Sequence, residues 1–286
     1  MILLLYPSVS NWYNSFHATM FIHDYETQLE TMEEEDLSAL WAAADEYSAS
    51  LEGRGDERFS PTQGEHAAYE SLLDVTGRGI MGVVEIPSVR VKLPIVHGVD
   101  RDALANAAGH MEGSSLPVGG PGTHCVLSGH RGLPSARLFT DLDKLREGDL
   151  FRLNILKQTL TYEVDQIRVV LPSEFGDLAI VPGEDLCTLL TCTPYGANSH
   201  RLLVRGHRVE NGIEDLFVAA EAERIGSNIV APLMAIPIVL GFTAWMLWSG
   251  RRERRDRQAG LPVRDRTPDL LYRRPGLRDL LSGGRK

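Results

Sequence analysis

The stretch from residue 80 to residue 209 restricts the fold of this chain more than any other. It contains seven short runs rich in Val, Ile and Leu, set off from one another by Gly, Pro and Asp. The runs cover residues 80–87, 89–96, 123–129, 150–157, 159–172, 186–193 and 201–209. Short runs bounded by turn-forming residues are typical of β-strands. We therefore expect a mainly β protein, with residues 77–210 forming a closed β-barrel.

Helices are expected around these strands. Residues 101–108 and 135–145 have the length of short helical insertions, capped by Asp100 and Ser135. Upstream, residues 18–50 place apolar side chains at spacings of three and four, which predicts one or two amphipathic helices. The polar stretch 53–66 contains Gly and Pro and predicts a loop, either a flap or a plain connector. The helical region as a whole is expected to cover residues 18–76.

The chain also contains a long uncharged segment. Residues 229–248 form 20 residues without charge, about the length that crosses roughly 30 Å of hydrocarbon. They predict a transmembrane helix, with a buried helix of a soluble core as the alternative. The basic run that follows places its own side in the cytoplasm. Residues 211–228 would then be a linker, residues 249–286 a basic cytoplasmic tail, and the barrel would lie outside the cell at the membrane.

The two ends of the chain differ in character. Residues 1–17 begin with MILLLYPSV, which we interpret as the end of an apolar N-terminal segment, as a truncated signal or anchor would leave. After residue 250 there are 12 Lys and Arg against 5 Asp and Glu, a net charge of +7. Because the whole chain has a net charge of −10, residues 1–250 have a net charge of −17. Because phosphate binding needs clustered Lys and Arg, this acidic domain is not expected to bind nucleic acid.

The cysteines point to chemistry. An odd number of them, Cys125, Cys187 and Cys192, lies in a domain predicted to be outside the cell, so at least one cannot pair within the chain. A free external thiol favours a catalytic role, although small buried hydrophobic residues are the alternative. Cys192 ends one predicted strand and Arg201 begins the next, which would place both side chains at one end of a barrel.

These residues carry a resemblance. The run Thr188 to Cys192 fits the TLxTC signature of the sortases, the strand 126–129 leads into a histidine as in their catalytic-histidine segment, and Arg201 stands where their arginine does. The matches span residues 79–209. The longer strings LSGHRGLPSARLFTDLDKL and CTPYGANSHRLLVRGHR resemble class C, the pilus-assembling sortases, as does an added C-terminal membrane helix.

The resemblance implies a cysteine transpeptidase without a cofactor or metal. Cys192 would be the nucleophile, His130 its acid/base partner and Arg201 the group that stabilises the oxyanion. Leu190 and Thr191, directly before the nucleophile, are predicted to contact the substrate. At unperturbed pKa values only about 1% of molecules at pH 7 would carry both a thiolate and an imidazolium. An arginine near the thiol, which is always positively charged, would therefore favour the thiolate form of the cysteine.

By the same resemblance, the substrate is an LPXTG-type sorting signal cleaved between Thr and Gly. The acyl group would form a thioester with the cysteine and pass to a lysine amine of a pilin subunit, which polymerises pili. A housekeeping sortase that attaches proteins to peptidoglycan is one alternative. A non-catalytic, membrane-anchored barrel that only binds is the other. Class C sortases also carry a lid with an Asp-Pro-aromatic motif, which is missing here, so Phe59 and Pro61 are the nearest lid candidates.

Three further interpretations concern residues near these candidates. Arg205 could take the place of Arg201. Asp141 and Asp143 could orient His130, but no third member of a triad is assigned. A zinc site is not expected, because no CxxC or HExxH pattern accompanies the histidines and cysteines near residue 125.

Overall fold

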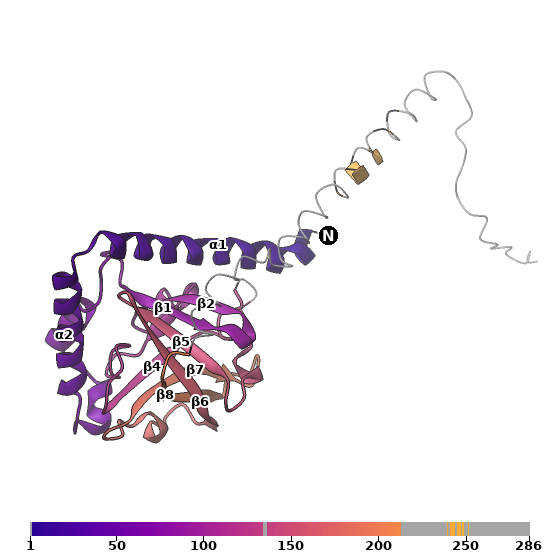
Figure 1. Cartoon of the computed structure of the whole chain (residues 1–286). Coiled ribbons are helices and arrows are strands. Elements are labelled where there is room, and N and C mark those ends of the chain that lie inside the picture. Colours follow the sequence, from indigo (N-terminus) through magenta and orange to yellow (C-terminus); the bar gives the residue numbers. More distant parts are fainter. Residues whose placement is uncertain are drawn as a thin grey trace, which may run out of the picture. The chain divides into compact units, whose positions relative to one another are not determined.

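The computed structural model describes residues 2–133 and 136–212, together with residues 239, 241–243, 245, 246, 248 and 251 (Figure 1). The chain divides into two units, Met1–Val230 and Ala231–Lys286, and the elements named here belong to the first. Its α-helices are α1 (Ile2–Thr31), α2 (Glu34–Ser50) and α3 (Gln63–Glu70). Its 3₁₀ turns are η1 (Gly55–Phe59), η2 (Pro87–Val89), η3 (Ala103–Ala105), η4 (Leu142–Lys144) and η5 (Gly176–Leu178). Its strands are β1 (Ile80–Ile86), β2 (Val91–His97), β3 (Ala108–His110), β4 (Thr123–Ser128), β5 (Leu150–Ile155), β6 (Gln158–Val170), β7 (Asp185–Thr193) and β8 (His200–Val209).

The strands of the described residues form one closed barrel in the order β1-β2-β3-β4-β7-β8-β6-β5. The predicted mainly β fold with a closed barrel is therefore confirmed. Neighbouring strands run antiparallel except for β2 with β3 and β4 with β7, which run parallel. Closure pairs the backbone of every strand on both sides, so the sheet has no free edge.

The two faces of the sheet are packed separately. Successive side chains of a strand point to opposite faces. Leu127 of β4 and Leu189 of β7 belong to the main hydrophobic cluster, which fills the barrel interior and also includes residues of α1 and α2. Val126 and Leu190, their neighbours in sequence, belong to a second and smaller cluster. The second cluster therefore lies on the outer face of the same strands.

The helices precede the barrel and pack on its outside. α1 contacts β1 and β2, and α2 follows it at an angle, as Figure 1 shows. α2 falls within the predicted helical region 18–76, whereas α1 already begins at Ile2 and includes most of the segment 1–17 that was predicted as the end of an apolar segment. The stretch 53–66, predicted as a loop, contains η1 and the first turn of α3. At the start of α3, Thr62 accepts from the Glu65 backbone while the Glu65 carboxylate accepts from the Thr62 N–H at 2.7 Å. This Thr-x-x-Glu capping box is a sequence signal that predicts a helix start.

The predicted short helices are only partly correct. Of the helix expected over residues 101–108, the single turn η3 forms, and Ala108 already begins β3. The predicted cap is present, because the Asp100 carboxylate accepts from the N–H groups of Asp102 and Ala103. Within the described part of residues 135–145, η4 is the helical turn, and Ser135 lies outside the described residues.

Most of the predicted transmembrane helix, residues 229–248, lies outside the described residues, as do nearly all of the predicted linker 211–228 and tail 249–286. Among the residues that are described, no helix combines the length and the apolar character needed to cross a bilayer. The placement of the barrel outside the cell and of the tail in the cytoplasm stays a prediction, which protease treatment of intact cells would test.

Tyr25 fastens α1 to the barrel. Its hydroxyl donates to the Met81 carbonyl and accepts from the Leu156 N–H, each at 2.9 Å, and burial raises the pKa of Tyr25 to about 12. We expect Tyr25→Phe to destabilise the protein by about 1–3 kcal/mol, because it leaves a buried N–H without a partner. Urea unfolding measures the effect. Tyr13→Phe, on the exposed side of α1, is the matched control, and equal losses for the two variants would contradict the anchor role.

Candidate active site

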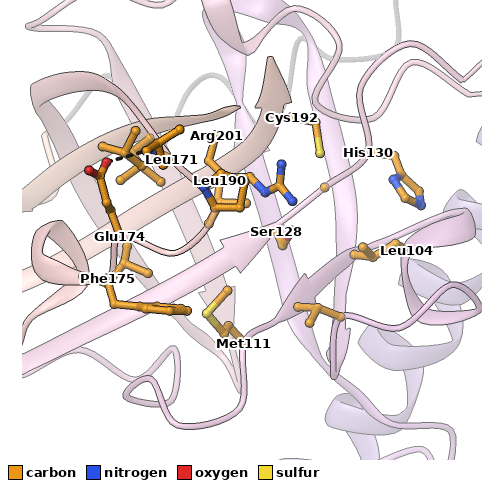
Figure 2. A pocket seen from close by; sticks show the side chains of 16 residues that line it. Leu104, Met111, Ser128, His130, Leu171, Glu174, Phe175, Leu190, Cys192 and Arg201 are labelled. Carbon is orange, nitrogen blue, oxygen red and sulfur yellow. Dashed lines mark hydrogen bonds between the residues drawn. The ribbon is translucent and has the colours of Figure 1, made fainter. Parts of the chain in front are cut away.

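A pocket of about 340 Å³ lies over the outer face of the barrel. Its floor comes from β4, β7, β8 and the end of β6. One wall is the connection between β6 and β7, with Phe175 and Leu178, and the other is the connection between β2 and β3, with Val99 and Leu104. Figure 2 shows Cys192 and His130 at one end of this pocket and Phe175 at the other. The pocket thus has a polar, reactive end and an apolar end.

The sheet register brings the three predicted catalytic residues into one row. Cys192 of β7 pairs directly with Arg201 of β8. On the other side of β7, Ser128 at the end of β4 pairs with Leu190. His130 follows Ser128 by two residues and Cys192 follows Leu190 by two residues, so the two residues lie at the same level. Directly paired side chains share a face of the sheet. All three side chains line the pocket, on the outer face of the barrel at the level where these strands end.

The three cysteines have different environments. Cys125 of β4 and Cys187 of β7 are opposite each other in the strand register, and both are free thiols buried in the barrel interior. Cys192 is half-buried at the pocket. Burial raises the pKa of the Cys187 thiol well above its usual value, which keeps that thiol protonated. Since the thiolate is the nucleophile and must reach a substrate, Cys192 is the cysteine that the fold makes available.

Arg201 and Arg205 differ in what they bind. The Arg205 guanidinium donates to both carboxylate oxygens of Asp165, at 3.1 and 2.8 Å. Arg201 instead donates from Nη1 to the backbone carbonyls of Asn198 and His200, each at 3.2 Å. Among the described residues Arg201 has no carboxylate partner, so its charge remains available to a group in the pocket. The geometry favours Arg201 over Arg205 as the cation of this site.

The two carboxylates that could orient His130 bind other groups. Asp143 accepts from Arg131 at 2.5 Å, and Asp141 accepts from Arg137 and Lys144. Within the described residues, the imidazole of His130 shows no hydrogen bond, while its backbone carbonyl accepts from the Phe139 N–H at 3.1 Å. The described residues therefore contain no Asp-His pair at this site.

The two predicted substrate contacts lie on opposite faces of β7. Leu190 lines the pocket, in a position to touch a bound group. Thr191 is fully buried, and its hydroxyl donates to the Gly129 carbonyl at 2.7 Å. Thr191 therefore supports the backbone before His130 and is not part of the pocket lining. The alternation of side chains along a strand explains the difference between these neighbours.

The lid candidates lie near the apolar end. The Phe59 ring stacks on Phe175 with 5.2 Å between ring centroids, and Phe59 packs against the second hydrophobic cluster. Arg58 is buried and donates to the Leu178 carbonyl at 2.6 Å, which holds η1 against the β6–β7 connection. Pro61 lies in the connection between η1 and α3. Phe59 is therefore placed over the end of the pocket away from Cys192.

Sequence reasoning missed the walls of the pocket. Met111, Phe175 and Leu178 come from connections that carry no motif.

In the described residues, no group of three His, Cys, Asp or Glu side chains is arranged to hold a metal ion.

Comparisons with known proteins give a consistent result. A family model described as "Sortase domain" matches residues 84–209. Sortase D of Bacillus subtilis is 31% identical over 131 residues, which cover 45% of this chain and 63% of that protein. The chain thus spans less than two thirds of that curated relative's length.

Solved structures match over more of their length. The crystal structure of sortase C1 from Streptococcus agalactiae is 49% identical, with a TM-score of 0.66, covering 68% of this chain and 100% of that one. The X-ray structure of Clostridium perfringens sortase C with the C-terminal cell wall sorting motif is 43% identical, with a TM-score of 0.58, covering 68% of this chain and 100% of that one. With its barrel, its half-buried cysteine and the paired arginine, the chain belongs to the sortase family, and class C sortases are among its close structural relatives.

Proposed function

We propose that this chain is a cysteine transpeptidase that cleaves an LPXTG-type sorting signal between Thr and Gly and transfers the acyl group to a lysine amine of a pilin subunit. The observation that carries the proposal is the direct pairing of Cys192 with Arg201 in the same pocket as His130. The structural relatives named as sortase C support the class, and the relative solved with a sorting motif supports the kind of substrate.

In the first step, the Cys192 thiolate attacks the carbonyl carbon of the substrate threonine. The carbonyl oxygen becomes negative in the tetrahedral intermediate, and the Arg201 guanidinium donates to it. His130 then protonates the glycine nitrogen, the C–N bond breaks, and the glycine-containing fragment leaves as an amine. The product is an acyl-thioester on Cys192, with His130 deprotonated.

In the second step, a lysine amine attacks the thioester carbonyl. His130 accepts the proton that the amine loses, the C–S bond breaks, and Cys192 is released as the thiolate. The new C–N bond is an isopeptide, so each cycle replaces one amide with another and consumes no cofactor. The apolar part of the pocket floor, which includes Leu190 and Leu203, suits the leucine and proline of such a signal.

Incubation with an LPXTG peptide tests the first step. We expect a covalent adduct on Cys192, detected by intact mass spectrometry and lost on hydroxylamine treatment, because a thioester is cleaved by strong amine nucleophiles. Cys192→Ala should form none. Cys187→Ala is the matched control, since Cys187 is buried and should not be acylated.

The acceptor separates the alternatives. A pilin lysine that resolves the adduct faster than a cell-wall peptide amine supports pilus assembly, and the reverse preference supports peptidoglycan attachment. If the folded wild-type protein forms no adduct, the remaining alternative is a barrel that binds its partner without catalysis.

Arg201 provides a second test. We expect Arg201→Ala to lower the rate of acylation about 10²–10³-fold, because the loss of one oxyanion donor typically costs roughly 3–4 kcal/mol in the transition state. The peptide concentration for half-maximal rate should change far less. Arg205→Ala removes an arginine from the same strand that is bound to Asp165, and is the control. Similar rate losses in both variants would refute the assigned role.

We also propose that η1 acts as a lid over the apolar end of the pocket. Phe59 stacks on Phe175, which lines the pocket, and Arg58 bonds to Leu178, which also lines it. A peptide that fills the apolar end would compete with these contacts. The lid would thus restrict entry of the substrate and leave the thiol itself uncovered by Phe59.

Removing the Phe59 ring tests the lid. An aromatic pair contributes about 0.5–1.5 kcal/mol beyond burial, so Phe59→Ala should speed labelling of Cys192 by a peptide-sized thiol reagent roughly 2- to 10-fold. Labelling is followed by mass spectrometry of the Cys192 peptide. Phe16→Ala changes an exposed ring on α1 and serves as the control. An unchanged labelling rate in Phe59→Ala would count against the lid.

A further inference from the structure

We propose that Arg131 is a positioning residue for the reaction proposed above. Its side chain joins the residue after His130 to the residue after Cys192, and so sets how closely the imidazole and the thiol approach. The inference rests on the proposed function, but its evidence is the set of contacts between the His130 segment and β7. These contacts lie on both sides of the histidine.

The backbone before His130 is held by β7. The Gly129 N–H donates to the Leu190 carbonyl at 3.0 Å, and the Thr191 hydroxyl donates to the Gly129 carbonyl at 2.7 Å. A Cβ at Gly129 would come within 2.6 Å of the Phe139 ring, so the backbone at Gly129 packs directly against this ring. The residue before the histidine is thus fixed to the two residues before the cysteine.

The segment after His130 has left the β4–β7 ladder, and a side chain restores the link. Arg131 Nη1 donates to the Thr193 hydroxyl at 3.2 Å, and Nη2 donates to Asp143 at 2.5 Å. The Arg131 side chain is only 12% exposed, compared with 44% for Asp143. Arg131 therefore reaches inward from its own loop to the strand that carries the nucleophile.

Packing supports the same link. The Gly132 backbone lies against the Tyr195 ring, where an added Cβ would come within 2.5 Å. Tyr195 belongs to the connection that follows β7. The segments that follow His130 and Cys192 therefore touch at two points, the hydrogen bond from Arg131 to Thr193 and the contact of Gly132 with the Tyr195 ring.

Arg131 does not duplicate Arg201. Its guanidinium is bound to a carboxylate and a hydroxyl, and the pair with Asp143 is neutral overall. A neutral pair contributes little net field to an oxyanion, whereas a planar fork with two partners fixes geometry well. Its effect on the reaction therefore acts through His130 and Cys192, without contact with the substrate.

Variants of Thr193 and Arg131 test the proposal. Thr193→Val removes the hydroxyl at nearly constant shape, Thr193→Ser keeps it, and Arg131→Lys keeps the charge but not the fork. The acylation rate at saturating LPXTG peptide, per molecule with a titratable Cys192, should fall roughly 10- to 100-fold in Thr193→Val and Arg131→Lys, since small misplacements have costs of that order. Thr193→Ser should stay close to wild type. The half-saturating peptide concentration and the melting temperature should change little.

The outcomes are distinct. A wild-type rate in Thr193→Val, or an equal loss in Thr193→Ser, overturns the proposal. If Arg131→Lys fails to fold, the two Thr193 variants still decide. If the wild-type protein forms no adduct, the proposed function fails. The positioning role is then judged by iodoacetamide alkylation of Cys192, which Thr193→Val should slow and Thr193→Ser should not, because thiol reactivity depends on its neighbouring base.

Discussion

The parallel pairing of β4 with β7 is the constraint on which the site depends. Because Ser128 pairs with Leu190, His130 just past the end of β4 and Cys192 near the end of β7 lie at the same level of the barrel. The antiparallel pairing of β7 with β8 then adds Arg201 beside the cysteine. A shift of one residue in either register would turn the affected side chains to the opposite face. The backbone ladder therefore aligns His130 with Cys192 and Arg201, which lie more than 60 residues further along the chain.

The same two-residue period separates packing from chemistry. On β7, Cys187 and Leu189 point into the barrel, while Leu190 and Cys192 point to the pocket. The interior position raises the pKa of the Cys187 thiol and removes it from solvent. The outer position leaves Cys192 within reach of a substrate. Parity along the strand decides which cysteine can react, since both have the same intrinsic chemistry.

The sequence predicted what local patterns encode. Short runs of branched residues between turn signals located all strands but one, and motifs pointed to the cysteine, the histidine and the arginine of the proposed site. β3 was missed because Ala108, Gly109 and His110 carry no strand signal, and its pairing comes from β2 and β4 on either side. Thr191 was predicted to touch the substrate because it precedes Cys192. Only the register shows that it points the other way.

Arginines near the site illustrate how partners decide roles. Arg201 donates to neutral carbonyls and keeps a net positive charge at the pocket, while Arg131 is paired with Asp143. The field of a cation next to a carboxylate falls off faster with distance than that of a cation bound to neutral groups. In the proposed reaction, an oxyanion forming on a bound peptide would therefore be stabilised far more by Arg201 than by Arg131. Arg131, whose charge is balanced, contributes the direction and length of its contacts. Residue type alone could not distinguish the two, because the difference lies in which acceptor each guanidinium meets.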